Sequence, residues 1–229
     1  MAARGTQRGI QLALDLRHRV AMGREDFLVS PSNADAVGWL DRWPDWPGPA
    51  LVIVGPAGCG KTHLGHVWCQ QAGAVPYNPD VAATDQVRRP VFVDDADHPG
   101  RDEALFHLFN AAGPAGVSLL LASRTPPAQW EGRLPDLKSR LAAAPNIFVQ
   151  APDTPLITAV MVKMFADEQM DVGADVLEYL VNRMERSFGA ARSLVQKLNN
   201  ASLASRRGIT IPLAREVLEM GAAADGDGT

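Results

Sequence analysis

One stretch of the chain carries the residue types needed to hold a phosphate. The apolar run LVIV at 51–54 leads into GPAGCGKTHL, where glycines at Walker A spacing are followed by Lys61 and Thr62. A glycine-rich turn between a strand and a helix lets backbone N–H groups point at a phosphate, and the helix N-terminus adds its positive dipole end. The spacing therefore predicts a nucleotide-binding loop, with Lys61 at the β- and γ-phosphates and Thr62 on Mg²⁺.

The expected nucleotide contacts extend over the whole loop and into the turn that follows it. The candidate nucleotide-binding residues of this segment are Gly55, Pro56, Ala57, Gly58, Cys59, Gly60, Lys61, Thr62 and His63. We interpret Cys59 as a small spacer in the loop rather than as a nucleophile. The chain has two cysteines, and together with Cys69 this residue forms neither a disulfide framework nor a metal-binding spacing.

A pair of carboxylates follows another apolar run, in VFVDDAD at 91–97. We expect Asp94 to orient the Mg²⁺ shell and Asp95 to position or polarise the attacking water. Two carboxylates at the end of a strand can also cap a turn. The phosphate-binding pattern earlier in the chain favours the metal interpretation, while Asp97 and His98 are interpreted as loop residues with no assigned role.

The elements that must position these groups alternate along the chain. We predict buried strands at 51–54, 74–77, 91–95, 117–122 and 147–150. Between them lie helical patterns at 61–72, 101–112 and 135–142. Near-continuous apolar strands separated by helices are typical of a parallel sheet covered on both faces.

The pattern changes near residue 152. Thr154 can cap a helix with Pro155 at its first position, and only helices follow, apart from a short ITI at 209–211. The predicted fold class is therefore α/β, a P-loop base with a five-stranded parallel sheet plus a small all-helical lid. We expect a flexible N-terminal tail at 1–24, the base at 25–151, the lid at 152–220 and a disordered tail at 221–229.

Composition limits the function classes. The chain has 229 residues, is 46% hydrophobic and carries a net charge of −4. A protein that lives mainly by neutralising DNA phosphates is usually basic, so we expect DNA contact to be indirect or weak. No apolar run is long enough for a membrane helix, and the N-terminus lacks the apolar run of a secretory signal, so we expect a cytoplasmic protein.

Leucines alternate in GIQLALDL at 9–16, ahead of the predicted base. Gln11, Leu12, Leu14 and Leu16 suit an edge strand or capping segment, because a period of two fits a half-buried extended piece. The alternative is an extended peptide that docks in a groove on another protein. The residues alone leave both interpretations open.

Four other features have competing interpretations. Trp39, Trp43 and Trp46 are expected to pack before the first strand rather than to form a nucleic-acid platform. Ser32 and Asn33 are candidates to cap the first helix of the base. Ser123 or Arg124, at the end of LLLASR, could sense a γ-phosphate or be ordinary turn residues. Arg140 and Arg192, taken alone, are most simply surface arginines.

The succession GPAGCGKTHLGH, VFVDDAD, LPDLKSRL, RSFGAARSL and ITIPLAREVLEM resembles the DnaA branch of the AAA+ ATPases. The resemblance runs from about Asp26 to Met220. It implies an AAA+ base that binds ADP or ATP with Mg²⁺, with Arg140 as the arginine finger and Arg192 as a lid arginine on the nucleotide. Arg124 stands where DnaA has an aspartate, so we expect weak or absent turnover by the chain itself.

Within that branch the chain resembles the short Hda family, whose tail motif binds the DNA polymerase sliding clamp. Gln11, Leu12, Leu14 and Leu16 match this motif, while Ala13 and Asp15 depart from it. The resemblance implies a regulator with the clamp and DnaA as partners, which promotes hydrolysis of DnaA-bound ATP and prevents re-initiation. A helicase-loader-like or adaptor module and a free-standing ATPase are the alternatives, and homodimerisation is left open.

Overall fold

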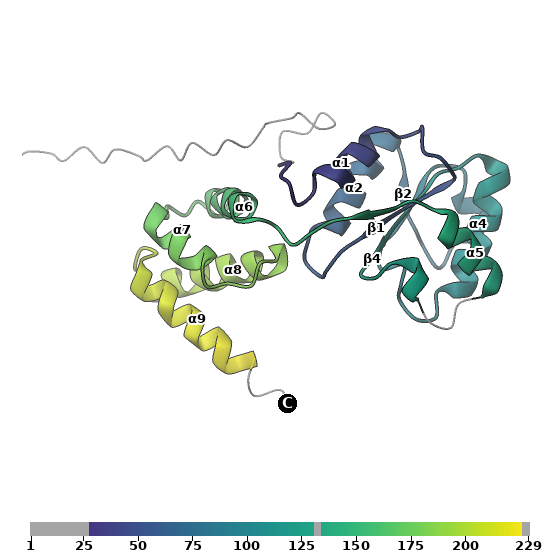
Figure 1. Cartoon of the computed structure of the whole chain (residues 1–229). Coiled ribbons are helices and arrows are strands. Elements are labelled where there is room, and N and C mark those ends of the chain that lie inside the picture. Colours follow the sequence, from purple (N-terminus) through teal and green to yellow (C-terminus); the bar gives the residue numbers. More distant parts are fainter. Residues whose placement is uncertain (1–27, 131–133, 226–229) are drawn as a thin grey trace, which may run out of the picture. The chain divides into compact units, whose positions relative to one another are not determined.

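The computed structural model describes residues 28–130 and 134–225, with side chains to residue 220. It divides into two compact units, with the division between Asp153 and Thr154. The first unit is an α/β base and the second is an all-helical lid (Figure 1). Each unit is described by itself.

The base holds a five-stranded sheet, as predicted. Its strands are β1 (Ala50–Val54), β2 (Val75–Pro76), β3 (Val91–Val93), β4 (Leu119–Ser123) and β5 (Asn146–Phe148). They lie in the order β2-β3-β4-β1-β5, and every neighbouring pair is parallel. The base also contains α1 (Ala34–Asp41), α2 (Lys61–Ala72), α3 (Ala83–Gln86), α4 (Asp102–Ala115), the 3₁₀ helix η1 (Pro127–Gln129) and α5 (Pro135–Ala143).

Alternation along the strands produces two separate cores. In β1, Leu51 and Ile53 face a cluster that includes Leu64 and Trp68 of α2. The intervening valines of β1 face the opposite cluster, to which α4 and α5 contribute their leucines. Helices therefore cover both faces of the sheet, which keeps the carboxyl ends of the strands as the edge where loops can gather (Figure 1).

The tryptophans before β1 pack into the base as predicted. The rings of Trp46 and Trp68 are stacked with centroids 5.4 Å apart, and Trp43 meets Trp68 edge-on at 6.2 Å. The indole of Trp46 donates to the carbonyl of Trp39 over 2.9 Å. These contacts fix the approach to β1 and favour the packing interpretation over a nucleic-acid platform.

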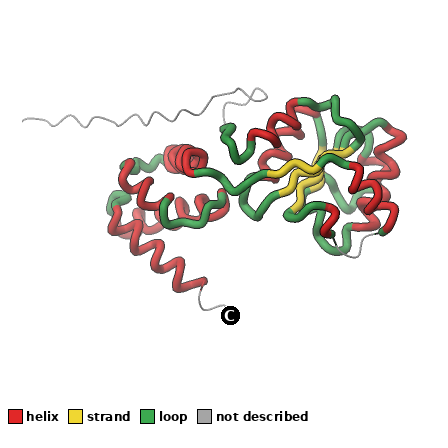
Figure 2. Tube along the Cα trace, viewed as in Figure 1, coloured by secondary structure: helices red, strands yellow, loops and turns green. Residues whose placement is uncertain are grey.

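The regular elements of the lid are helices, joined by loops (Figure 2). Its elements are α6 (Thr154–Asp167), α7 (Ala174–Val181), α8 (Phe188–Ser205) and α9 (Ile211–Asp225). The buried faces of α7 and α8 carry the residues expected from their helical spacing, among them Leu177, Leu180 and Leu198. The apolar stripes of the four helices thus meet in one core.

Three local expectations differ from the structure. The short ITI at 209–211, set apart from the helices, is not separate from them throughout, because Ile211 starts α9. That helix continues to Asp225, beyond the expected end of the lid at 220. At its other end the lid begins with Thr154 as the first residue of α6, one position before the expected Pro155. In the part of the chain described here, we find no helix with the length and apolarity of a membrane span.

Candidate nucleotide-binding site

The phosphate loop connects β1 to α2 through positions that only glycine fills easily. Gly58 and Gly60 have φ angles of 70° and 101°, in the left-handed region that a Cβ disfavours. A Cβ on Gly55 would overlap the carbonyl of Val149 and lie 2.8 Å from the sulfur of Cys59. The loop therefore turns tightly against β5 and leads directly into the first turn of α2.

The N-terminus of α2 is arranged to receive an anion. Gly60 occupies the N-cap position, and no side chain caps the helix there. The first N–H groups of a helix have no partner within it, and they carry the positive end of the helix dipole. Phosphate oxygens are the acceptors that such an end accommodates.

Lys61 lies inside the loop. Its side chain is buried, and Nζ donates to the carbonyl oxygens of Gly55 at 2.8 Å and Pro56 at 2.9 Å. The sulfur of Cys59 is 3.9 Å from the same nitrogen. Burial raises the pKa of the Cys59 thiol against the opposing effect of Lys61, so the thiol is neutral, which suits a spacer better than a nucleophile.

Thr62 and Asp94 come together across the site. The Thr62 hydroxyl donates to Oδ2 of Asp94 over 2.7 Å, although the two residues lie on α2 and after β3. A hydroxyl and a carboxylate are the oxygen donors that Mg²⁺ uses when nucleotide phosphates complete its coordination. Among the described residues there is no cluster of three or more histidine, cysteine, aspartate or glutamate side chains that could hold a metal ion alone. The donor set therefore fits Mg²⁺ bound together with a nucleotide.

Asp95 is exposed and adopts a left-handed backbone conformation, with φ of 45°. Its N–H donates to Oδ1 of Asp94 over 3.0 Å. The two carboxylates of the pair thus differ in environment. Asp94 uses both oxygens within the site, and Asp95 extends its carboxylate to solvent.

The loop after β3 contains two further polar residues whose contacts the sequence did not indicate. The Arg101 guanidinium, at the start of α4, donates to the main-chain carbonyl of Asp94. Asp97 Oδ2 accepts the N–H groups of Arg124 at 2.8 Å and Thr125 at 3.3 Å, which joins this loop to the end of β4. The only local signal for the Arg101 contact is that Gly100 directly precedes Arg101, which lies seven residues after Asp94.

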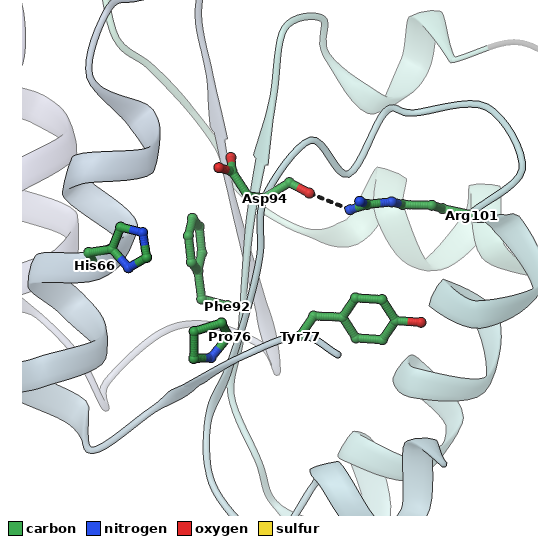
Figure 3. A pocket seen from close by; sticks show the side chains of 6 residues that line it. All are labelled: His66, Pro76, Tyr77, Phe92, Asp94 and Arg101. Carbon is green, nitrogen blue, oxygen red and sulfur yellow. Dashed lines mark hydrogen bonds between the residues drawn. The ribbon is translucent and has the colours of Figure 1, made fainter. Parts of the chain in front are cut away.

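A cavity of about 170 Å³ opens beside Asp94 (Figure 3). Its lining residues are His66, Pro76, Tyr77, Phe92, Asp94 and Arg101. In Figure 3 Arg101 reaches Asp94 from one side and His66 faces the Phe92 ring from the other, with ring centroids 5.9 Å apart. This cavity therefore lies at the carboxyl end of β3, next to the Thr62–Asp94 pair.

Comparisons with known proteins find similarity to DnaA and to the Hda lid. Residues 158–218 match the family model described as Hda, lid domain. The chain is 26% identical to the chromosomal replication initiator protein DnaA of Thermomicrobium roseum, over 86% of this chain and 49% of that protein. It thus spans about half the length of this curated relative.

Solved structures share the fold. Domain III of the Thermotoga maritima replication initiation protein DnaA has a TM-score of 0.69 and 20% identity, covering 84% of this chain and 93% of that one. AMPPCP-bound DnaA from Aquifex aeolicus has a TM-score of 0.66 and 17% identity, covering 93% of this chain and 71% of that one. The chain therefore has the AAA+ fold with a helical lid, is related in sequence to DnaA, and matches the Hda family in its lid.

Ser123 and Arg124, the two candidates to sense a γ-phosphate, lie at the end of β4 and directly after it. Ser123 is fully buried at the end of β4, and its hydroxyl donates to the carbonyl of Thr125 over 2.9 Å. Arg124 is exposed, and its backbone N–H is the group bound by Asp97. The structure therefore supports the turn interpretation for Ser123.

The remaining site residues lie on helices. Arg140 is exposed in the last turn of α5, and Leu137 and Leu141 anchor that helix in the core. His63 is exposed in the first turn of α2. Arg192 is exposed on α8 of the AAA+ lid, which is the other compact unit. Gln11, Leu12, Leu14 and Leu16 lie outside the described residues.

One capping prediction needs correction. Asn33 stands at the N-cap of α1, but its side chain does not cap that helix. Instead Oδ1 accepts the N–H of Ser30 at 2.9 Å, and Nδ2 donates to the carbonyl of Leu28 at 3.0 Å. The Ser32 hydroxyl lies 2.7 Å from that of Ser30. Both side chains therefore fold the segment before α1 rather than satisfy the helix end.

Proposed function

We propose that this chain binds ADP or ATP with Mg²⁺ and acts in the cytoplasm as a regulator of DnaA. The observation that carries nucleotide binding is the convergence of Thr62 and Asp94 beside the loop that holds Lys61. An arrangement of glycine loop, lysine, hydroxyl and carboxylate has little use other than holding phosphates and their metal ion.

Each group has a separate task in this proposal. The backbone N–H groups at the start of α2 and the Lys61 ammonium bind phosphate oxygens, while Arg192 of the lid is proposed to contact the same nucleotide. Thr62 and Asp94 hold Mg²⁺, which neutralises phosphate charge when bound. Asp95 is the group that can orient a water molecule, since its carboxylate is exposed next to Asp94.

The regulatory part of the proposal rests on the match of the lid to the Hda lid family and on the position of Arg140. A guanidinium supplied to ATP on a neighbouring subunit stabilises the charge of the transferring phosphoryl group. Arg140 is exposed near the end of α5, where it can reach a partner such as ATP-bound DnaA. Stimulated hydrolysis would convert DnaA to its ADP form and prevent re-initiation.

The tail is proposed to be the tether. Gln11, Leu12, Leu14 and Leu16 would bind the groove of the DNA polymerase sliding clamp, which raises the local concentration of the base near DnaA. Equilibrium binding of the full chain to the clamp, beside a Gln11→Ala, Leu14→Ala variant, tests this. Binding that disappears in the variant supports the tether. No binding by the parent chain refutes it, and binding to the replicative helicase instead would favour a loader.

The arginine-finger proposal has its own experiment. ATP hydrolysis by DnaA is measured with and without this chain, for the parent, Arg140→Ala and Lys138→Ala. Both side chains are exposed on α5, so the lysine variant controls for the loss of a surface cation on the same helix. We expect stimulation to fall about 10³-fold for Arg140→Ala and to persist for Lys138→Ala. Equal stimulation by all three proteins would refute a role for Arg140.

A second candidate function is ATP hydrolysis by the chain alone, which the exposed Asp95 beside Asp94 favours. Turnover by the purified chain that Asp95→Asn abolishes, with nucleotide still bound, would support this function. Sedimentation of the same sample with and without nucleotide would show whether two copies associate.

A further inference from the structure

The backbone at Asp95 needs an explanation, because a residue with a side chain rarely adopts a φ of 45°. Aspartate tolerates this left-handed region better than most residues, but the conformation persists only where surrounding bonds enforce it. Asp95 is also the residue proposed above to orient water. What holds this residue in place therefore bears directly on its chemistry.

Four hydrogen bonds hold the two peptide groups on either side of Asp95. On the preceding peptide, Asp95 N–H donates to Asp94 Oδ1 over 3.0 Å, and the carbonyl of Asp94 accepts the Arg101 guanidinium. On the following peptide, the Asp95 carbonyl accepts His98 N–H over 3.0 Å, and Ala96 N–H donates to Ala122 of β4 over 2.8 Å. Fixing both peptide planes fixes φ and ψ of the residue between them.

The hydrogen bond from Arg101 differs from the other three hydrogen bonds. The bonds made by Ala96 and His98 use backbone groups, and the bond within the carboxylate pair uses the proposed metal ligand itself. The arginine comes from the N-cap position of α4, next to Gly100 with a φ of 87°, and it is half-buried. Its guanidinium closes the loop from Asp94 to Arg101 and anchors that loop to a long helix packed in the core.

We propose that Arg101 is a positioning residue that keeps Asp95 in its left-handed conformation by holding the Asp94–Asp95 peptide. It contacts the main-chain carbonyl and not the carboxylate of Asp94, which Thr62 and Asp95 N–H occupy. The inference rests on the proposed function for the role of Asp95, while the positioning itself is independent of it. Arg101 thus acts on water orientation and leaves nucleotide affinity to the phosphate loop.

Two substitutions of Arg101 distinguish the effect of its hydrogen-bond donor from the effect of its bulk. Arg101→Met keeps an apolar stem without a donor, and Arg101→Gln keeps an N–H donor without the charge. Arg88→Met is the matched control, because it removes an exposed arginine of the same unit whose ion pair with Asp85, at 3.3 Å, lies elsewhere. All three are made in the full chain.

Amide hydrogen exchange across 94–98 is the first readout. We expect the Asp95 and His98 amides to exchange about tenfold faster in Arg101→Met, with Arg101→Gln and Arg88→Met close to the parent chain. The amides of β4 report whether the sheet is intact. Unchanged exchange in Arg101→Met, or no restoration by Arg101→Gln, overturns the proposal.

The second readout compares nucleotide affinity with hydrolysis. Affinity for Mg²⁺–ADP should stay within about twofold in Arg101→Met, because the side chain touches neither the phosphate loop nor the metal ligands' donor atoms. Where hydrolysis is measured, Arg101→Met combined with Asp95→Asn should be no slower than Asp95→Asn alone. Additive losses of hydrolysis in the double variant would contradict the proposal that Arg101 acts through Asp95. Failure of the proposed function appears separately, as nucleotide binding that Lys61→Ala does not change.

Discussion

The hydroxyl of Thr62 and the carboxylate of Asp94 are joined by a hydrogen bond of 2.7 Å, which links the first turn of α2 to the end of β3. The two residues are far apart in the chain, and the parallel sheet brings them together because both follow strands at their carboxyl ends. This one bond marks where the proposed Mg²⁺ would sit.

Removing the Thr62 hydroxyl should therefore affect metal-dependent binding only. We expect Thr62→Val to weaken nucleotide affinity in Mg²⁺ by about 10- to 100-fold, because one oxygen ligand and the partner of Asp94 are lost together. Calorimetry of ADP binding with Mg²⁺ and with a chelator measures the difference. Thr62→Ser keeps the hydroxyl and is the control. An equal loss of affinity in the presence of the chelator would contradict the metal role.

Gly65 packs α2 directly against a side chain of the sheet. A Cβ at this position would overlap the ring of Phe92, which lies in the core below the helix. We expect Gly65→Ala to lower the free energy of unfolding by about 1–3 kcal/mol through overpacking, despite the better helix propensity of alanine. Urea unfolding measures the change.

Gly38 in α1 is the matched control for Gly65. A Cβ there meets no atom within 4 Å, so Gly38→Ala should be neutral or stabilising by up to about 1 kcal/mol. If Gly65→Ala raised stability as Gly38→Ala is expected to do, helix propensity rather than the contact with Phe92 would account for both changes.

Ser187 caps α8, which is the longest lid helix within the described residues. Its hydroxyl accepts the N–H of Ala190 over 3.1 Å at the start of α8. Ser187→Ala should reduce the stability of the lid by about 1 kcal/mol, since one N–H at the helix end then lacks its partner. Hydrogen exchange of α8 amides measures this. Ser193→Ala, an exposed position on the same helix, should leave exchange nearly unchanged; a loss of similar size there would argue against the cap.

Cys69 should make the folded chain sensitive to high pH. Burial in the core beside Trp68 raises the pKa of its thiol from the ordinary 9.0 to about 11. The folded state therefore keeps the proton longer than the unfolded state, so this contribution is complete below pH 9 and is lost as the pH rises towards 11. The free energy of unfolding should fall more steeply over this range in the parent chain than in Cys69→Ala. Parallel curves would exclude the thiol as the cause.

Much of the base could be predicted from the sequence, because the apolar periodicity of its helices and strands is strong and turn residues mark the ends of these elements. The helix expected at 61–72 is α2 to the residue, since Gly60 precedes it and Gly73 follows it with a φ of 61°. The strand expected at 74–77 is reduced to Val75–Pro76 at the edge of the sheet, where Pro76 is tolerated because the N–H groups of Val75 and Tyr77 make the bonds to the β3 side.

The parts that escaped prediction depend on contacts between distant loops. Asp97 was assigned no role, yet it binds the turn after β4, and that neighbour is set by strand order rather than by local sequence. The same holds for Arg101, whose carbonyl partner carries no side-chain signature. The residue types in a motif predict which side chains bind a ligand. Side chains that bind only the main chain of a distant loop can be identified once the strand order is known.

The position of β1 between β4 and β5 also affects how the chain folds during synthesis. Its two neighbours in the sheet, β4 and β5, both come later in the sequence, so β1 leaves the ribosome with no strand to pair with. The phosphate loop that follows β1 leans on Val149, directly after β5. We therefore expect a nascent chain to complete the proposed nucleotide site only after residue 149 has emerged, so that nucleotide would not stabilise shorter intermediates through this loop.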